Sequence, residues 1–123
     1  MIGYRRHKTG RRGEALAQSY LRAKSIKVID RNYRCKFGEI DLIARQHDTI
    51  IFIEVKTRTH HQFGPPEASV TKAKQRKIIQ VALGYLTQHE LHDAPVRFDV
   101  IGITLMGNKH RLNHIEAAFD ASI

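Results

Sequence analysis

The feature that most constrains this chain is an apolar run with two charged residues at its end. Residues Thr49 to Thr57 read TIIFIEVKT and are rich in β-branched side chains. Such a block is typical of a strand covered on both faces, so we expect it to be the central strand of a sheet. Glu54 and Lys56 stand two positions apart within it. Because side chains alternate along a strand, these two point to the same face.

A second strand is expected just before the central one. In the segment Glu39 to Arg45, apolar residues alternate with more polar ones, and Asp41 stands between two apolar neighbours. Only residues 46–48 separate the two strands, which favours an antiparallel hairpin. A hairpin could bring Asp41 onto the face of Glu54 and Lys56, although a slip of one residue would move it away.

The rest of the chain predicts two helices and three more strands. We expect helices at about Gly13 to Lys24 and at Thr71 to Gln88, and strands at Lys27 to Tyr33, from Pro95 through Ile103, and near Arg111 to Ile115. Thr9 is expected to cap the first helix, and Arg58 to Ser69 to form a mobile loop. These elements predict an α/β fold with a mixed central sheet flanked by helices, in the order αβββαββ. Nothing divides the 123 residues, so we expect a single domain over residues 1–123.

The charge balance favours a polyanionic partner. Lys and Arg number 21 against 12 Asp and Glu, which gives a formal net charge of +9. Nucleic acid is the first candidate, although anionic membranes and acidic proteins attract the same charge and a basic face can serve solubility alone. The basic residues expected to contact nucleic acid are Arg34, Arg58, Lys72, Lys74 and Lys77.

The cysteine and histidine residues bear on the cellular compartment and on whether a zinc site is expected. The single Cys35 fits a reducing compartment, and the basic N-terminal stretch lacks the apolar run of a secretory signal or membrane anchor. We therefore expect a cytoplasmic protein with no membrane partner. The histidine pairs His60-His61 and His110 with His114 lack zinc-site spacing, so the histidines are expected at the surface or against substrate.

The charged residues within the strands suggest hydrolytic chemistry. Carboxylate oxygens of Asp41 and Glu54 suit Mg²⁺ or Mn²⁺, which polarises a phosphate and helps to generate hydroxide. The ammonium of Lys56 could orient water or stabilise developing charge. In the alternative interpretation, Glu54 and Lys56 form a partly buried ion pair and Asp41 accepts hydrogen bonds from a loop.

Several segments carry a family resemblance that covers nearly the whole chain. They are GRRGEALA (Gly10 to Ala17), NYRCKFGEIDLIA (Asn32 to Ala44), FIEVKTR (Phe52 to Arg58), FGPPEASV (Phe63 to Val70) and RFDV (Arg97 to Val100). They resemble the YraN family of small bacterial proteins. The resemblance implies the restriction-endonuclease-like core of the PD-(D/E)XK superfamily, which is shared with archaeal Holliday junction resolvases.

The same resemblance assigns roles to particular residues. The superfamily motif falls on Asp41, Glu54 and Lys56, and Glu14 matches an acidic residue that many members place on the first helix. Asp41 follows Ile40 where many members have a proline. An acid near a helix N-terminus is also favoured by the helix dipole alone, which is the other interpretation of Glu14. Nucleases of this fold often dimerise, so the resemblance also implies a homodimer.

Together these features predict a metal-dependent nuclease that hydrolyses phosphodiester bonds. The chain has no obvious second module for reading bases, so we expect a structure-selective enzyme that acts on DNA in preference to RNA. A non-catalytic nucleic-acid-binding or scaffold domain that retains the nuclease fold is the alternative. A protein-interaction module with a coincidental acidic pair is a third, weaker hypothesis.

Overall fold

The computed structural model describes residues 2–59 and 64–121, with side chains from residue 10 onward. Its elements are α1 (Ile2–Ala23), β1 (Lys27–Cys35), β2 (Gly38–Gln46), β3 (Thr49–Thr59), the 3₁₀ helix η1 (Pro66–Ser69), α2 (Lys72–Gln88), β4 (Val96–Met106) and β5 (Lys109–Phe119). No helix in the described part of the chain is long and apolar enough to cross a membrane.

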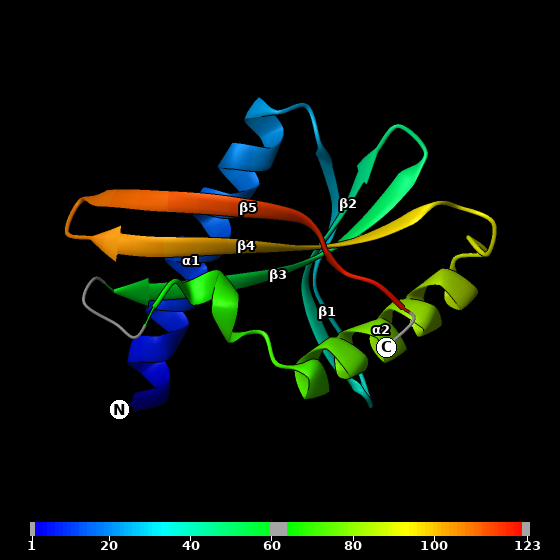
Figure 1. The fold of residues 1–123 in the computed structure, drawn as a ribbon, viewed down its shortest axis with the longest axis horizontal. Helices are drawn as coiled ribbons and strands as arrows, with labels where there is room; N and C mark the ends of the chain where they lie inside the picture. The colour runs from blue at the N-terminus through cyan, green and yellow to red at the C-terminus, as the bar shows by residue number, and fades with distance from the viewer. Residues whose placement is uncertain (1, 60–63, 122–123) are drawn as a thin grey trace.

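The five strands form one mixed sheet in the order β1-β2-β3-β4-β5 (Figure 1). The first three strands are an antiparallel meander, β4 is parallel to β3, and β5 is antiparallel to β4. The parallel pair requires a crossover, which η1 and α2 provide. The predicted α/β class with a mixed sheet is therefore confirmed, and β3 lies in the middle as expected.

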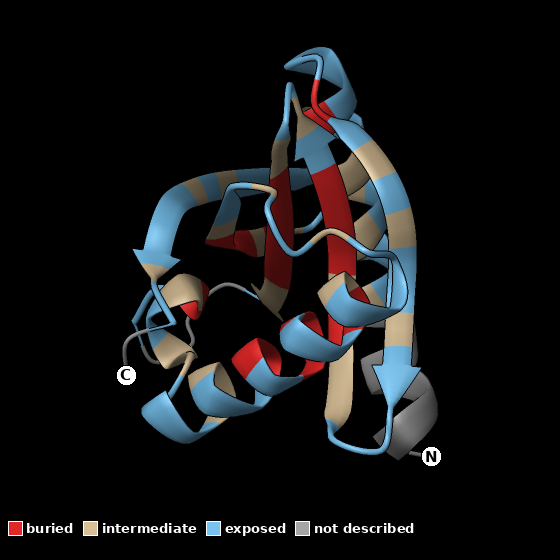
Figure 2. Cartoon of the chain, turned by 90° about the vertical axis from the view of Figure 1, so that its right-hand side faces the viewer, coloured by how far each residue is buried: buried red, intermediate tan, exposed pale blue. Residues whose placement is uncertain are grey.

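Two hydrophobic cores lie on opposite faces of the sheet. Under α1, Ile51 and Ile53 of β3 pack with Leu21. Under α2, the alternate residues Ile50 and Phe52 pack against the helix. Figure 1 shows α1 behind the sheet and α2 in front of it, and Figure 2 shows the buried stretches in the middle strands and on the inner side of α2. The continuous apolar run of β3 thus follows from helices on both of its faces.

The first helix begins earlier than the sequence pattern suggested. The helix runs from Ile2, so Thr9 lies inside it and the prediction that Thr9 caps the helix is wrong. Apolar periodicity marked only the part that packs on the sheet, while the preceding segment is rich in Arg and Lys, which are good helix formers. At Gly13 the helix backbone comes so close to β3 that a Cβ atom would overlap the Thr57 hydroxyl.

The expected loop from Arg58 to Ser69 is only partly a loop. Strand β3 continues to Thr59 because it keeps its parallel partner, β4, as far as Leu105. Pro66 to Ser69 form η1, where Pro suits the first turn of a helix. Residues 60–63, which include His60 and His61, lie outside the described residues. The crossover therefore brings η1 over the sheet beside β3 and β4.

Candidate active site

The acidic residues meet where β2 separates from β3. The last paired residues are Leu42 and Ile53, so the next position on each strand is Asp41 and Glu54. Beyond this point the Val55 amide has lost a partner in β2 and instead donates to Asp41 Oδ2 at 2.8 Å. The carboxylate thus replaces a sheet hydrogen bond, which fixes it beside Glu54.

Glu54 is a buried acid, only 5% exposed. Burial, the nearby charge of Asp41 and a hydrogen bond with its carboxyl raise the pKa of Glu54 to about 8. Lys74 Nζ at 3.6 Å and Lys56 Nζ at 3.8 Å from Oε2 lower the pKa of Glu54, but burial and Asp41 outweigh them. Burial also raises the pKa of Asp41. At neutral pH the pair therefore keeps a proton, with Glu54 donating to the Asp41 carboxylate.

Glu14 approaches this pair from α1. Burial and then the charge of Asp41 raise the pKa of Glu14, while a hydrogen bond with the Asn32 side chain lowers it. Asn32 lies on β1 and has a positive φ of 51°, which Asn tolerates better than most residues. Glu14 is therefore within electrostatic reach of Asp41. No three His, Cys, Asp or Glu side chains among the described residues are grouped closely enough to hold a metal ion.

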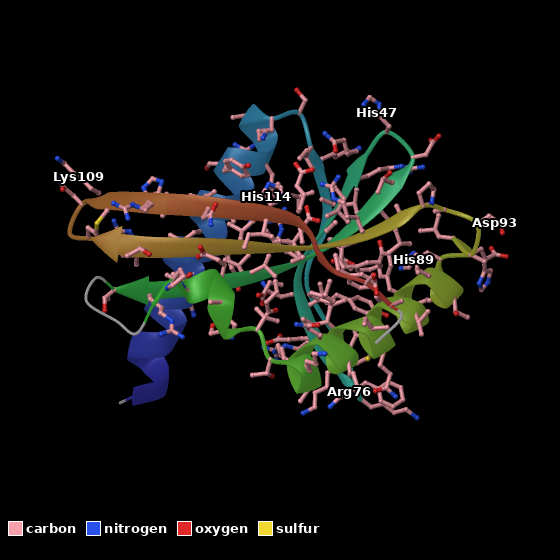
Figure 3. All side chains as sticks on the ribbon, viewed as in Figure 1. His47, Arg76, His89, Asp93, Lys109 and His114 are labelled. Atoms are coloured by element: carbon pink, nitrogen blue, oxygen red, sulfur yellow. The ribbon has the colours of Figure 1, made fainter. Side chains whose placement is uncertain are left out.

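The residues expected to bind nucleic acid take different places. Arg34 lies beside the β1–β2 turn and pairs with Glu39 at 2.8 Å. Arg58 lies on β3 two positions beyond Lys56, and so on the same face. Lys72 and Lys77 are exposed on α2, as is Arg76, on the side of that helix away from the sheet (Figure 3). Of Lys72, Lys74 and Lys77 on α2, it is Lys74 that contacts the acidic pair.

A second polar cluster ties the last two strands to α1. Asp99 is fully buried and accepts hydrogen bonds from Arg97 Nε and Nη2 and from the Ala117 amide. His114, midway along the edge strand β5 (Figure 3), bridges Asp99 at 2.7 Å and the Tyr20 hydroxyl at 2.9 Å. The expectation that this histidine lies at the surface or against substrate is wrong, because its ring is buried in this network.

Two contributors to the site were missed from the sequence. Asn32 carried only a weak signal, since an Asn inside a strand pattern can mark a residue with positive φ. Lys74 was grouped with the basic face of its helix, and nothing in the linear order indicated that it would contact Glu54. Thr71 caps α2 by accepting from the Lys74 amide at 3.1 Å, and in this first turn Lys74 Nζ lies 3.6 Å from Glu54 Oε2 of β3.

The fold and the site define the chain as a mixed α/β domain that carries a proton-sharing acidic pair flanked by lysines. A family model described as "Uncharacterised protein family UPF0102" matches residues 13–103. The chain belongs to this family, and the predicted YraN-like membership is confirmed. The matched region contains Glu14, Asp41, Glu54 and Lys56.

Relatives in three bacterial lineages match most of the chain. A UPF0102 protein of Geobacter metallireducens is 48% identical over 111 residues, covering 90% of this chain and 91% of the relative. A UPF0102 protein of Clostridioides difficile is 48% identical over 107 residues, covering 87% and 92%. One from Myxococcus xanthus is 41% identical over 118 residues, covering 96% and 94%. The described domain thus accounts for nearly the full length of these relatives.

Proposed function

We propose that this protein is a divalent-metal-dependent nuclease that hydrolyses phosphodiester bonds in nucleic acid. We further propose that its sheet is a restriction-endonuclease-like core, with structured DNA preferred over RNA as substrate. The observation that carries the proposal is that half-buried Asp41 lies beside buried Glu54, where burial and the charge of Asp41 raise the pKa of Glu54 to about 8 although two lysines lie near it. Such an arrangement costs folding free energy, and strained titratable pairs of this kind cluster at functional sites.

The donor set fits a small divalent cation. Two carboxylates suit Mg²⁺ or Mn²⁺, which seldom rely on protein ligands alone and complete their coordination with water and substrate oxygens. Asp41 and Glu54 would hold the ion. A cation there would favour the ionised form of both acids and so displace the proton that Glu54 keeps. When bound, the metal supplies a polarised phosphate and a water of lowered pKa.

The chain's own residues orient the reacting groups. The Val55 amide holds the Asp41 carboxylate in place, so this ligand loses little freedom on binding. The Lys56 ammonium lies on the same face and is positioned to stabilise charge on the scissile phosphate. Lys74 neutralises part of the acidic charge that would otherwise repel a polyanion. Glu14, beside Asp41, is placed to accept a proton from a water near the pair.

The charge of the molecule supports nucleic acid as the substrate. A net charge of +9 attracts a phosphate backbone before any specific contact forms. Exposed Lys72 and Lys77 lie on the helix that covers the site face, and Arg58 extends that face beyond Lys56. We also propose that two copies act together on the two strands of a duplex, in the cytoplasm, where an exposed Cys35 would stay reduced.

The direct test is a cleavage panel. The pure protein is incubated with Mg²⁺ or Mn²⁺ and with duplex, single-stranded and branched DNA and RNA. We expect cleavage of branched DNA, and loss of at least about a hundredfold in the double variant Asp41→Asn with Glu54→Gln. The matched control is Glu39→Gln, which removes an acid from the same strand outside the pair. Cleavage of none of the substrates, or full cleavage by the double variant, would overturn the proposal.

A second measurement detects metal binding and does not require cleavage. Because Glu54 must lose its proton, Mn²⁺ binding near pH 7 should release protons. Calorimetric titrations in two buffers of different ionisation enthalpy would reveal this release as a buffer-dependent heat. The double variant should show neither the heat nor the proton release.

The second candidate is a non-catalytic nucleic-acid-binding domain. The observation in its favour is that Lys56 and Lys74 both contact Glu54, as they would in a purely structural ion-pair network. This candidate predicts salt-sensitive binding that changes at Asp41 and Glu54 leave intact, with no cleavage under any metal condition.

A further inference from the structure

A pocket of about 540 Å³ lies between η1 and the β4–β5 hairpin. Its volume is in the range of about 300–1,000 Å³ that is usual for small-ligand sites. Gly102 and Thr104 of β4 form the floor, their paired residues Asn113 and Arg111 of β5 continue it, and Pro65 and Pro66 form a wall. The proline wall belongs to the GPPE segment of the sequence, to which the proposed catalytic chemistry assigns no role.

Strand register connects this pocket to the acidic pair. Glu54 is paired with Val100 of β4, and Lys56 is paired with Gly102. Gly102 is in turn paired with Asn113 of β5. Directly paired residues share a face of the sheet, so the pocket floor lies on the face of Glu54 and Lys56. The pocket floor begins at the level of Lys56, which is two residues, or roughly 7 Å along the strand, beyond Glu54.

The polar groups of the pocket are held in fixed positions. Glu67 of η1 accepts a hydrogen bond from Asn113 Nδ2 at 2.7 Å. Its side chain packs over Gly102 so closely that a Cβ atom there would overlap Glu67 Oε1. Glu67 therefore presents a positioned acceptor, and Asn113 keeps a second N–H and its carbonyl. The exposed Arg111 adds a guanidinium at the rim.

We propose that this pocket holds one unpaired nucleotide of the strand engaged at the acidic pair. Its base packs against the proline wall and donates its exocyclic amino group to Glu67, while Arg111 contacts its phosphate. A carboxylate accepts from the amino group of cytosine, whereas thymine presents a carbonyl at that position. The inference rests on the proposed nuclease function and narrows its substrate to DNA with unpaired, amino-bearing bases.

Binding is tested in EDTA, so that no cleavage is required. Fluorescence anisotropy compares oligo-dC, oligo-dT and a blunt duplex. We expect oligo-dC to bind about tenfold more tightly than oligo-dT, and Glu67→Leu to remove that preference. Arg111→Ala should weaken oligo-dC more than the duplex. The charge-matched control Arg22→Ala, on α1, should weaken both equally and leave the preference for dC intact. Equal binding of dC and dT by the wild-type protein would overturn the proposal.

A titration of the unaltered protein keeps the test independent of variant folding. Deoxycytidine monophosphate should shift the NMR amide signals of Gly102 and Asn113, and thymidine monophosphate should shift them far less. Shifts from deoxycytidine monophosphate alongside a failed cleavage panel would leave the nucleotide pocket standing and remove the nuclease. Cleavage without these shifts would support the nuclease and overturn the nucleotide pocket.

Discussion

At Asp41 and Glu54 the protonation state follows from burial and like charge acting together. Each carboxyl is removed from water, and the charge of Asp41 further disfavours ionisation of Glu54. The Val55 amide lowers the pKa of Asp41, so the shared proton resides on Glu54. If the proposed cation binds there, its charge would favour the ionised form of both acids.

The raised pKa of Glu54 makes folding stability depend on pH. Its ordinary pKa is 4.5 and its pKa in the folded protein is about 8, so between these values the folded state binds more protons than the unfolded chain. The contribution of Glu54 to stability is therefore complete below about pH 4.5 and is lost as pH rises through about 8. Without metal, we expect urea unfolding to show this decline, and Glu54→Gln to remove it and to be the more stable protein at pH 9. Glu39→Gln should keep the wild-type slope. A wild-type stability that is flat from pH 5 to pH 9 would contradict the assigned protonation.

Asp99 shows the opposite behaviour under similar burial. Burial raises its pKa, but hydrogen bonds from His114, Arg97 and the Ala117 amide outweigh it and leave the pKa of Asp99 below its ordinary value. The number of hydrogen-bond donors thus separates Asp99, whose pKa is lowered, from Asp41 and Glu54, whose pKa values are raised. His114 then links Asp99 to Tyr20, so this network fastens α1 to the last two strands.

Among the elements, α1 and α2 are fixed to the sheet in different ways. α2 begins at a Thr71 cap and buries an apolar side. α1 approaches β3 at Gly13, where only a glycine fits against Thr57. The position of α1 matters to the site, because it sets how close Glu14 lies to Asp41.

Gly13 and Gly84 form a matched test of this close approach. We expect Gly13→Ala to lower the free energy of unfolding by about 2 kcal/mol, because the added methyl group collides with β3. In Gly84→Ala on α2 the added methyl group meets nothing within 4 Å, so this variant should raise the free energy of unfolding by about 0.5–1 kcal/mol through helix propensity. Urea unfolding at pH 6 measures both. If Gly13→Ala proves as stabilising as Gly84→Ala, the close packing of α1 on β3 is wrong.

At the scale of the whole molecule, the excess of basic residues governs how nucleic acid is first bound. The positive side chains lie on several elements, from the β1–β2 turn to α2 and the tip of the β4–β5 hairpin, where Figure 3 labels Lys109. A distribution of this kind favours backbone contacts over base readout.

We expect duplex binding to weaken steeply with salt, as released counterions require. In a plot of log K against log salt, Lys72→Ala and Lys77→Ala should each reduce the slope by about 1. Glu90→Gln, just beyond the C-terminal end of α2, changes the charge by one unit of opposite sign and removes no phosphate contact, so it should leave the slope unaltered. Anisotropy titrations at several salt concentrations provide the measurement. Binding that is indifferent to salt would exclude the phosphate backbone as the main contact.

The strands and α2 were predictable because their signals are local. The unbroken apolar run of β3, the short hairpin and the helical periodicity of α2 each depend on neighbouring residues. Errors arose where the partner is remote. The last residues of β3 are held by β4, and the buried setting of His114 is created by Asp99 and Tyr20. None of these partners is near in sequence.

For the candidate site, strand alternation by itself determined that Glu54 and Lys56 share a face, because the side-chain period of a strand is a local property. Only the tertiary structure decided that β2 leaves β3 at Asp41, that Asn32 and Glu14 gather beside it, and that Lys74 reaches Glu54. It also decided the proton on Glu54, since that pKa depends on burial and on a charge thirteen positions away in the chain. Sequence order sets which groups a strand presents, whereas their distances and the water around them are set by the packed fold.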